Sequence, residues 1–310
     1  MQKVIAKAIA VAAGALFSAF AIASPSAHAE PSSEPLVIND VEFDETAERQ
    51  IDQLLKDGRL VSLPDFFKSL PANRREVPLA AASETVLQAP EIAERLLAST
   101  LAIGTTSYCK ECKTWHVYLS SGFMASNTGV AATSLHIFQD FEEAVDETYP
   151  IAVDAAGRVY PVTTLLAADA DADSCLIQLD GAGHIPPLPL APSARTGEMV
   201  YLMSHPDGRY FRFSEGIIAR LAGSVIDGKK LTFLDVTAEF APGSSGGPLV
   251  NQQGNVVGHV STIAAAPLAE DGTDADGSAV VERLCTSSSV VTTLAESGLN
   301  RRVTMQSVPE

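Results

Sequence analysis

Six residues in the C-terminal third of this 310-residue chain, Gly243 to Pro248, have the composition of a loop that can carry nucleophilic chemistry. They read Gly-Ser-Ser-Gly-Gly-Pro, with Ser245 at the centre. Glycine lets backbone N–H groups turn inward toward one point, where they can hold an oxyanion. Apolar residues flank the loop, from Phe233 to Val236 before it and at Leu249 and Val250 after it. A flexible Gly/Ser linker lacks such flanks, so the sequence indicates a structured loop in which Ser245 is a candidate nucleophile.

The order of partner residues along the chain separates two enzyme folds that carry such a serine. In α/β-hydrolases the acid and the histidine follow the serine. Only His259 follows Ser245, and no carboxylate lies between the two. In chymotrypsin-like enzymes the order is His, Asp, Ser. The sequence therefore favours the second order and requires a histidine and an aspartate upstream.

Three segments resemble the chymotrypsin-like serine proteases, most closely the HtrA/Deg branch. The nucleophile loop matches the branch's Pro-Gly-x-Ser-Gly-Gly-Pro, and Ser121-Gly-Phe followed by Thr133-x-x-His136 matches the histidine segment. Asp169-x-x-x-Asp173, followed by a strand-like run, matches the acid segment. The resemblance implies that His136 is the general base and Asp173 the acid that orients it.

The match is not complete, because Ser134 and Leu135 stand where the HtrA branch has two asparagines. This departure leaves the role of His136 as general base intact. By order alone His116 competes with it, but its place at a strand start beside Trp115 indicates ordinary packing.

The resemblance also implies an oxyanion hole and a specificity pocket. The N–H groups of Gly243 and Ser245 would hold the oxyanion. Phe240 would stand at the pocket's wall and Glu239 at its base. The opposite side would be formed by a substrate-binding strand: Val260, Ser261, Thr262 and Ile263. Because an unpaired buried carboxylate is costly, we expect Glu239 to turn away and Phe240 to select small aliphatic residues.

Acidic segments raise the question of calcium. Four carboxylates follow EF-hand spacing: Asp169, Asp171, Asp173 and Asp180. The EF-hand needs glycine at its sixth position, where this chain has Ser174. A second acidic loop, 270–277, lacks the first ligand. We therefore expect neither a metal nor a cofactor.

The chain contains four cysteines, whose pairing the sequence must be used to predict. Cys109 and Cys112 are close in sequence, whereas Cys175 and Cys285 are isolated. A structural zinc would want a second close pair, and an oxidising compartment favours disulfides. The sequence weakly favours a Cys109–Cys112 bond, with the other two as small buried residues or a cross-link between barrels.

The elements around these residues are mostly short alternating strands. From residue 100 onward, runs such as 116–125, 130–138, 211–221 and 256–262 predict an all-β domain. The resemblance implies a double six-stranded antiparallel β-barrel. We expect amphipathic helices at 45–56 and 90–98, the first capped by Asp44, and a closing C-terminal helix over 287–296.

The ends of the chain predict how it is organised. Residues 1–29 read as a secretory signal peptide, with cleavage after Ala29. The expected parts are a leader at 1–29, an extension or propeptide at 30–98, the protease domain at 99–297 and a tail at 298–310. The HtrA branch usually carries a PDZ domain after this point, which we do not expect here.

Composition and motifs together predict the function. A net charge of −17 disfavours nucleic acid as a partner, and we expect no stable membrane anchor. The sequence predicts a periplasmic or secreted serine endopeptidase acting on proteins or peptides. The alternative is a catalytically silent binding module with the same fold.

Overall fold

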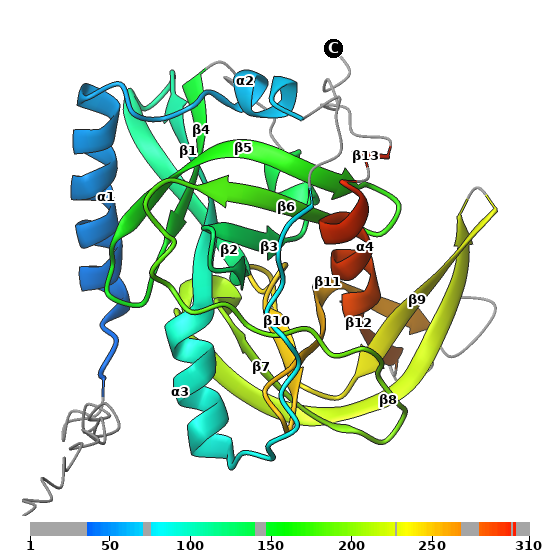
Figure 1. The fold of residues 1–310 in the computed structure, drawn as a ribbon. Coiled ribbons are helices and arrows are strands. Elements are labelled where there is room, and N and C mark those ends of the chain that lie inside the picture. Colours follow the sequence, from blue (N-terminus) through cyan, green and yellow to red (C-terminus); the bar gives the residue numbers. More distant parts are fainter. Residues whose placement is uncertain are drawn as a thin grey trace, which may run out of the picture. The chain divides into compact units, whose positions relative to one another are not determined.

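Two closed antiparallel β-barrels of six strands each make up most of the protein (Figure 1). The computed structural model describes residues 36–70, 76–139, 147–226, 228–267, 279–298 and 300–301. The chain divides into two units, Met1–Val37 and Ile38–Glu310, and the described helices and strands lie in the second. The signal segment, the acidic loop 270–277 and the tail from 302 lie outside the described residues.

The first barrel closes in the order β5-β4-β1-β2-β3-β6, because β5 also pairs with β6. Its strands are β1 (Thr100–Cys109), β2 (Thr114–Ser126), β3 (Val130–Thr133), β4 (Thr148–Val153), β5 (Val159–Asp169) and β6 (Ser174–Leu179). A short β13 (Asn300–Arg301) runs parallel to β5. Leu101, Met124, Ile177 and neighbouring apolar side chains fill the barrel.

The second barrel closes in the order β10-β11-β12-β9-β8-β7. Its strands are β7 (Met199–Ser204), β8 (Arg212–Ile226), β9 (Lys229–Val236), β10 (Pro248–Asn251), β11 (Val256–Pro267) and β12 (Ala279–Ser287). Leu202, Leu234, Leu249 and Val260 lie in its core. The predicted double barrel is therefore confirmed.

The described residues contain four α-helices beside the barrels: α1 (Asp40–Lys56), α2 (Leu63–Lys68), α3 (Ala89–Ser99) and α4 (Ser288–Ser297). The predicted helices over 45–56, 90–98 and 287–296 correspond to α1, α3 and α4. The predicted cap of α1 was wrong: the helix begins five residues earlier, where the Asn39 side chain accepts from the Glu42 N–H. Helix α2 was not predicted, although Ser62 caps it and Pro64 lies in its first turn.

The N-terminal helices share a core with both barrels. Phe43 and Ile51 of α1 and Ile92 of α3 are buried in one cluster with Met203 and Phe211. The Phe43 ring lies edge-on to Phe211, with ring centroids 5.8 Å apart. Helices α1 and α3 are thus packed against the barrels rather than standing apart from them.

Candidate active site

His136 and Asp173 meet at the end of the first barrel. His136 begins a single 3₁₀ turn directly after β3, and Asp173 occupies the turn between β5 and β6. The His136 Nδ1 lies 2.7 Å from Asp173 Oδ2. An ionised carboxylate only accepts hydrogen bonds, so the Nδ1 carries the hydrogen and donates it. The neutral ring therefore keeps its lone pair on Nε2.

The Asp173 carboxylate is held by a second strand as well. Ser261 Oγ donates to Asp173 Oδ2 over 3.0 Å. The pairing of β11 with β12 shifts between Val260 and Thr262, so Ser261 is the extra residue of a β-bulge, a device that re-aims a side chain. Burial raises the pKa of Asp173, but the hydrogen bonds and charge of His136 outweigh it, and the pKa lies below its ordinary value.

A second histidine, His259, lies behind the aspartate and was not predicted as part of the site. Its Nε2 is 3.4 Å from the Asp173 carbonyl oxygen. The ring is fully buried, and burial lowers its pKa. A neutral His259 can donate from Nε2 and support the turn that carries Asp173.

The loop around Ser245 is fixed to both barrels through its backbone. Gly246 N–H donates to the Val260 carbonyl over 2.7 Å, and Ser121 N–H donates to the Ser245 carbonyl over 2.9 Å. Gly246 has φ +84°, and a Cβ there would overlap the Ser121 carbonyl oxygen and the Thr133 hydroxyl. Only glycine fits this position, which accounts for one glycine of the motif.

The peptide before Gly243 is oriented by a neighbouring loop. Asp207 N–H donates to the Pro242 carbonyl over 2.7 Å. Because the peptide is planar and trans, this bond turns the Gly243 N–H in the opposite direction. Ser121 Oγ donates to the Gly243 carbonyl over 2.9 Å. Within the described chain, no acceptor is found for the N–H of Gly243 or of Ser245.

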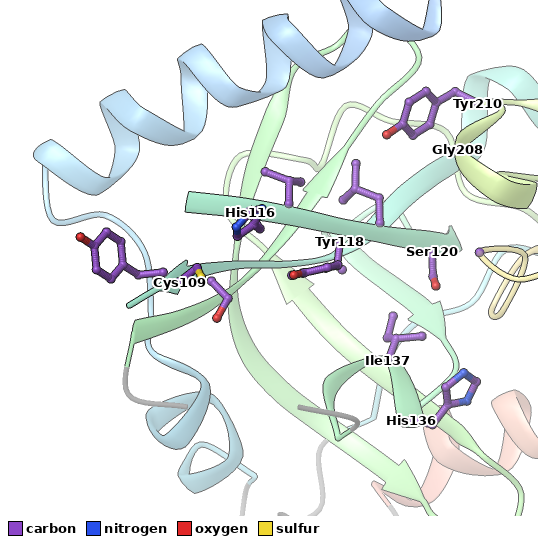
Figure 2. A pocket seen from close by; sticks show the side chains of 14 residues that line it. Cys109, His116, Tyr118, Ser120, His136, Ile137, Gly208 and Tyr210 are labelled. Atoms are coloured by element: carbon purple, nitrogen blue, oxygen red, sulfur yellow. The ribbon is translucent and has the colours of Figure 1, made fainter. Parts of the chain in front are cut away.

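The predicted catalytic residues line one hollow of about 450 Å³. Its walls include His136, Asp173 and Ser245, together with Phe240. Three residues of β11 also line it: Val260, Ser261 and Thr262. A second hollow of about 780 Å³ shares His136 and extends along β2 past Tyr118 (Figure 2).

The predicted pocket residues differ in their placement. Phe240 is buried in the pocket wall. Glu239 is exposed, does not line this pocket, and pairs with Arg212 at 3.5 Å. The sequence offered no such partner, because Arg212 lies 27 residues away. Ile263 is part of β11, but its side chain is outside the described residues.

The carboxylates that resemble a calcium loop have other partners. Asp169 is buried, and its carboxylate forms an ion pair with Lys229. Asp180 pairs with Arg59 at 2.8 Å. Asp173 is held by His136 and Ser261 as described, so the EF-hand spacing does not bring these groups to one point.

All four cysteines are free thiols in this structure. The pairing of Cys109 with Cys112 that the sequence favoured is therefore not formed here. Cys175 and Cys285 are buried in different barrels, in the cores described above. Burial raises the pKa of both thiols, so the structure agrees with small buried residues rather than a cross-link.

Comparisons with known proteins match part of this chain to related peptidases. Residues 120–258 match the model of the trypsin-like peptidase domain. The chain is 31% identical over 147 residues to a probable periplasmic serine endoprotease DegP-like of Pseudomonas fluorescens. Similarly named proteins of Ectopseudomonas mendocina and Hahella chejuensis are 31% and 29% identical.

These alignments are partial on both sides. Each covers 46–47% of this chain and 29% of the relative. The chain thus spans under a third of the length of these relatives. Among the described helices, none is long and apolar enough to cross a membrane.

Proposed function

Because the chain carries a trypsin-like peptidase domain of the HtrA type, we propose that it is a serine endopeptidase that cleaves peptide bonds in proteins or peptides. The observation that carries the proposal is the hydrogen bond from His136 Nδ1 to Asp173. This bond uses the hydrogen on Nδ1, so the lone pair of the ring is on Nε2. The His136 ring lines the same hollow as Ser245. A base in this state can take the serine proton.

The proposed reaction follows the chymotrypsin scheme. Ser245 Oγ attacks the scissile carbonyl carbon while His136 Nε2 takes the hydroxyl proton. The tetrahedral intermediate collapses, and the amine leaves with that proton from His136. Water, deprotonated by His136, then attacks the acyl-enzyme, and the proton returns to Ser245 as the acid product leaves.

Two sets of backbone groups support this chemistry. The N–H groups of Gly243 and Ser245 would stabilise the negative oxygen of the intermediate, each such donor being worth about 10²–10³ in rate. The bulged part of β11, from Val260 to Thr262, lies past the point where β10 stops pairing with it. An extended substrate could add to this edge as a further strand.

The proposed location is the periplasm or the cell exterior. The named relatives are periplasmic by their printed names, and residues 1–29 read as a signal peptide with cleavage after Ala29. Determining the N-terminus of the exported protein by mass spectrometry tests this part. A mature chain that begins at Glu30 supports it, and retention of Met1 contradicts it.

A fluorophosphonate probe tests the catalytic assignment, because it labels only an activated serine. We expect label on Ser245 in the wild type and none in Ser245→Ala. His136→Ala should lose labelling nearly as completely, since the serine is a poor nucleophile without its base. A folded wild type that takes no label would instead indicate a catalytically silent binding module, and turnover retained by Ser245→Ala would overturn the assignment.

A further inference from the structure

The hairpin between β1 and β2 brings together three side chains that the proposed peptidase chemistry does not use. The strand register places Cys109 opposite Thr114, so His116 is its diagonal neighbour on the same face. Cys112 lies in the connecting turn. The Cys112 Sγ is 2.9 Å from the His116 Nε2, and the two sulfurs and one ring nitrogen all lie within 4.8 Å of one another.

These distances suit a tetrahedral metal. With Zn–S bonds of about 2.3 Å and Zn–N bonds of about 2.0 Å, the ligand atoms of a zinc site lie about 3.5–3.8 Å apart. The Cys112 Sγ to His116 Nε2 separation of 2.9 Å is shorter than that range, and the other separations are at most 4.8 Å, so shifts of up to about 1 Å would produce it. Cys112 and the rest of the turn are exposed, which leaves room for such a shift.

The backbone of the turn brings Cys112 back toward Cys109. Cys112 N–H donates to Cys109 Sγ over 3.3 Å. Lys113, directly after Cys112, has φ +55°, an uncommon conformation for a lysine that lets the turn close.

We propose that Cys109, Cys112 and His116 bind a zinc ion. Soft thiolates and an imidazole select zinc over calcium or magnesium. Binding releases the two thiol protons to solvent, so two thiolates neutralise the ion. Three protein ligands leave a fourth position open, for water or for a group of a bound peptide.

The site lies on the wall of the second hollow. Cys109 and His116 both line the cavity of about 780 Å³ that reaches His136, with Tyr118 between them and the catalytic histidine (Figure 2). Zinc would tie the end of the hairpin to β2 and so stiffen this wall. The sequence has no second close cysteine pair, but His116, four residues after Cys112, can take the place of one as a ligand.

Zinc binding can be measured apart from peptidase activity, in the full exported chain carrying Ser245→Ala and kept reduced. We expect one equivalent of zinc per chain in competition with a chromophoric zinc chelator. Cobalt should give the intense absorption of thiolate–cobalt charge transfer. Hydrogen exchange should slow at residues 109–116 when zinc is added.

Matched variants locate the ion. Cys112→Ser and His116→Ala should each weaken zinc binding by at least about tenfold. The control is His184→Ala, which removes an exposed histidine that contacts Tyr160 and Gly181 instead, and it should bind as the parent does. No stoichiometric zinc in the reduced chain, or equal binding by Cys112→Ser, would overturn the proposal. If the isolated chain contains a Cys109–Cys112 disulfide, only reduction should restore binding.

Discussion

His136 donates two hydrogen bonds to the same carboxylate, that of Asp173. The ring Nδ1 reaches Oδ2 at 2.7 Å, and the backbone N–H reaches Oδ1 at 2.9 Å. One aspartate therefore sets both the position of the histidine backbone and the orientation of its ring. Asp173 itself has φ +49°, so its turn is held in an uncommon conformation to make both contacts.

Asp173→Asn should reduce kcat by about 10⁴, the effect of the equivalent change in the chymotrypsin family. An amide can donate to Nδ1, which would stabilise the tautomer with its hydrogen on Nε2 and leave no lone pair for Ser245. Steady-state cleavage of an unfolded protein substrate measures kcat. Asp180→Asn, which alters an exposed carboxylate paired with Arg59, should leave kcat unchanged. A drop of less than tenfold in Asp173→Asn would argue against its proposed role.

The lowered pKa of Asp173 predicts a pH-dependent contribution to stability. Because the folded pKa lies below the unfolded one, the folded state favours the ionised carboxylate. The contribution is present above the unfolded pKa of about 3.9 and disappears as pH falls through the folded pKa. The difference in free energy of unfolding between the wild type and Asp173→Asn should shrink below about pH 4. Chemical denaturation between pH 7 and pH 3 checks this, and a constant difference would contradict it.

The sequence predicted the β fold because the pattern of alternating strands is local. Alternating strands indicate a β domain wherever they pack, and the glycine at 246 is required by its own backbone angle. Cys112 and His116 are also close in the sequence, four residues apart. The motif Cys-x-x-Cys-x-x-x-His marks that cluster.

Contacts between distant parts of the chain could not be predicted in this way. Glu239 meets Arg212, and Asp169 meets Lys229 across 60 residues. The first pairing depends on how β8 and the segment after β9 meet within the second barrel, and the second on how β5 and β9 of the two barrels lie against each other. Asp44, which was expected to cap α1, lies inside the helix and accepts a hydrogen bond from Tyr210, 166 residues away.

Specificity should depend on Phe240 rather than Glu239. Phe240 is buried in the wall of the hollow beside Ser245, whereas the Glu239 carboxylate points to Arg212 outside it. Cleavage sites on an unfolded protein should fall after small aliphatic residues such as Val or Ala. Phe240→Leu should shift the profile toward other side chains, and Glu239→Ala should leave it unchanged. A majority of cuts after Lys or Arg that Glu239→Ala abolishes would show that the acid selects the substrate.

Calcium should have no effect on activity or stability. The carboxylates of Asp169 and Asp180 already pair with cationic side chains. Added calcium chloride should leave the melting temperature and the cleavage rate as they are. A rise of several degrees in millimolar calcium would contradict this prediction. Magnesium chloride at equal ionic strength is the control for salt effects.

Helix α1 should support catalysis through Tyr210. The Tyr210 hydroxyl donates to Asp44 of α1, and the Tyr210 N–H donates to Asp40 over 3.1 Å. Burial and the Asp44 carboxylate raise the pKa of Tyr210, so the hydroxyl keeps its proton and donates. Three residues earlier in the same loop, the Asp207 N–H holds the carbonyl of Pro242. The helix is thereby connected to the peptide that orients the proposed oxyanion donor.

Tyr210→Phe should therefore lower kcat severalfold with little change in KM, because the oxyanion donor acts mainly in the transition state. It should also lower the free energy of unfolding by about 1.5–3 kcal/mol, the range for a hydrogen bond to a charged group. Arg49→Ala, which removes an exposed i,i+4 pair with Glu45 on the same helix, should change neither. Steady-state kinetics and urea denaturation of both variants distinguish the cases. A Tyr210→Phe protein that loses stability at unchanged kcat would show that α1 only packs against the barrels.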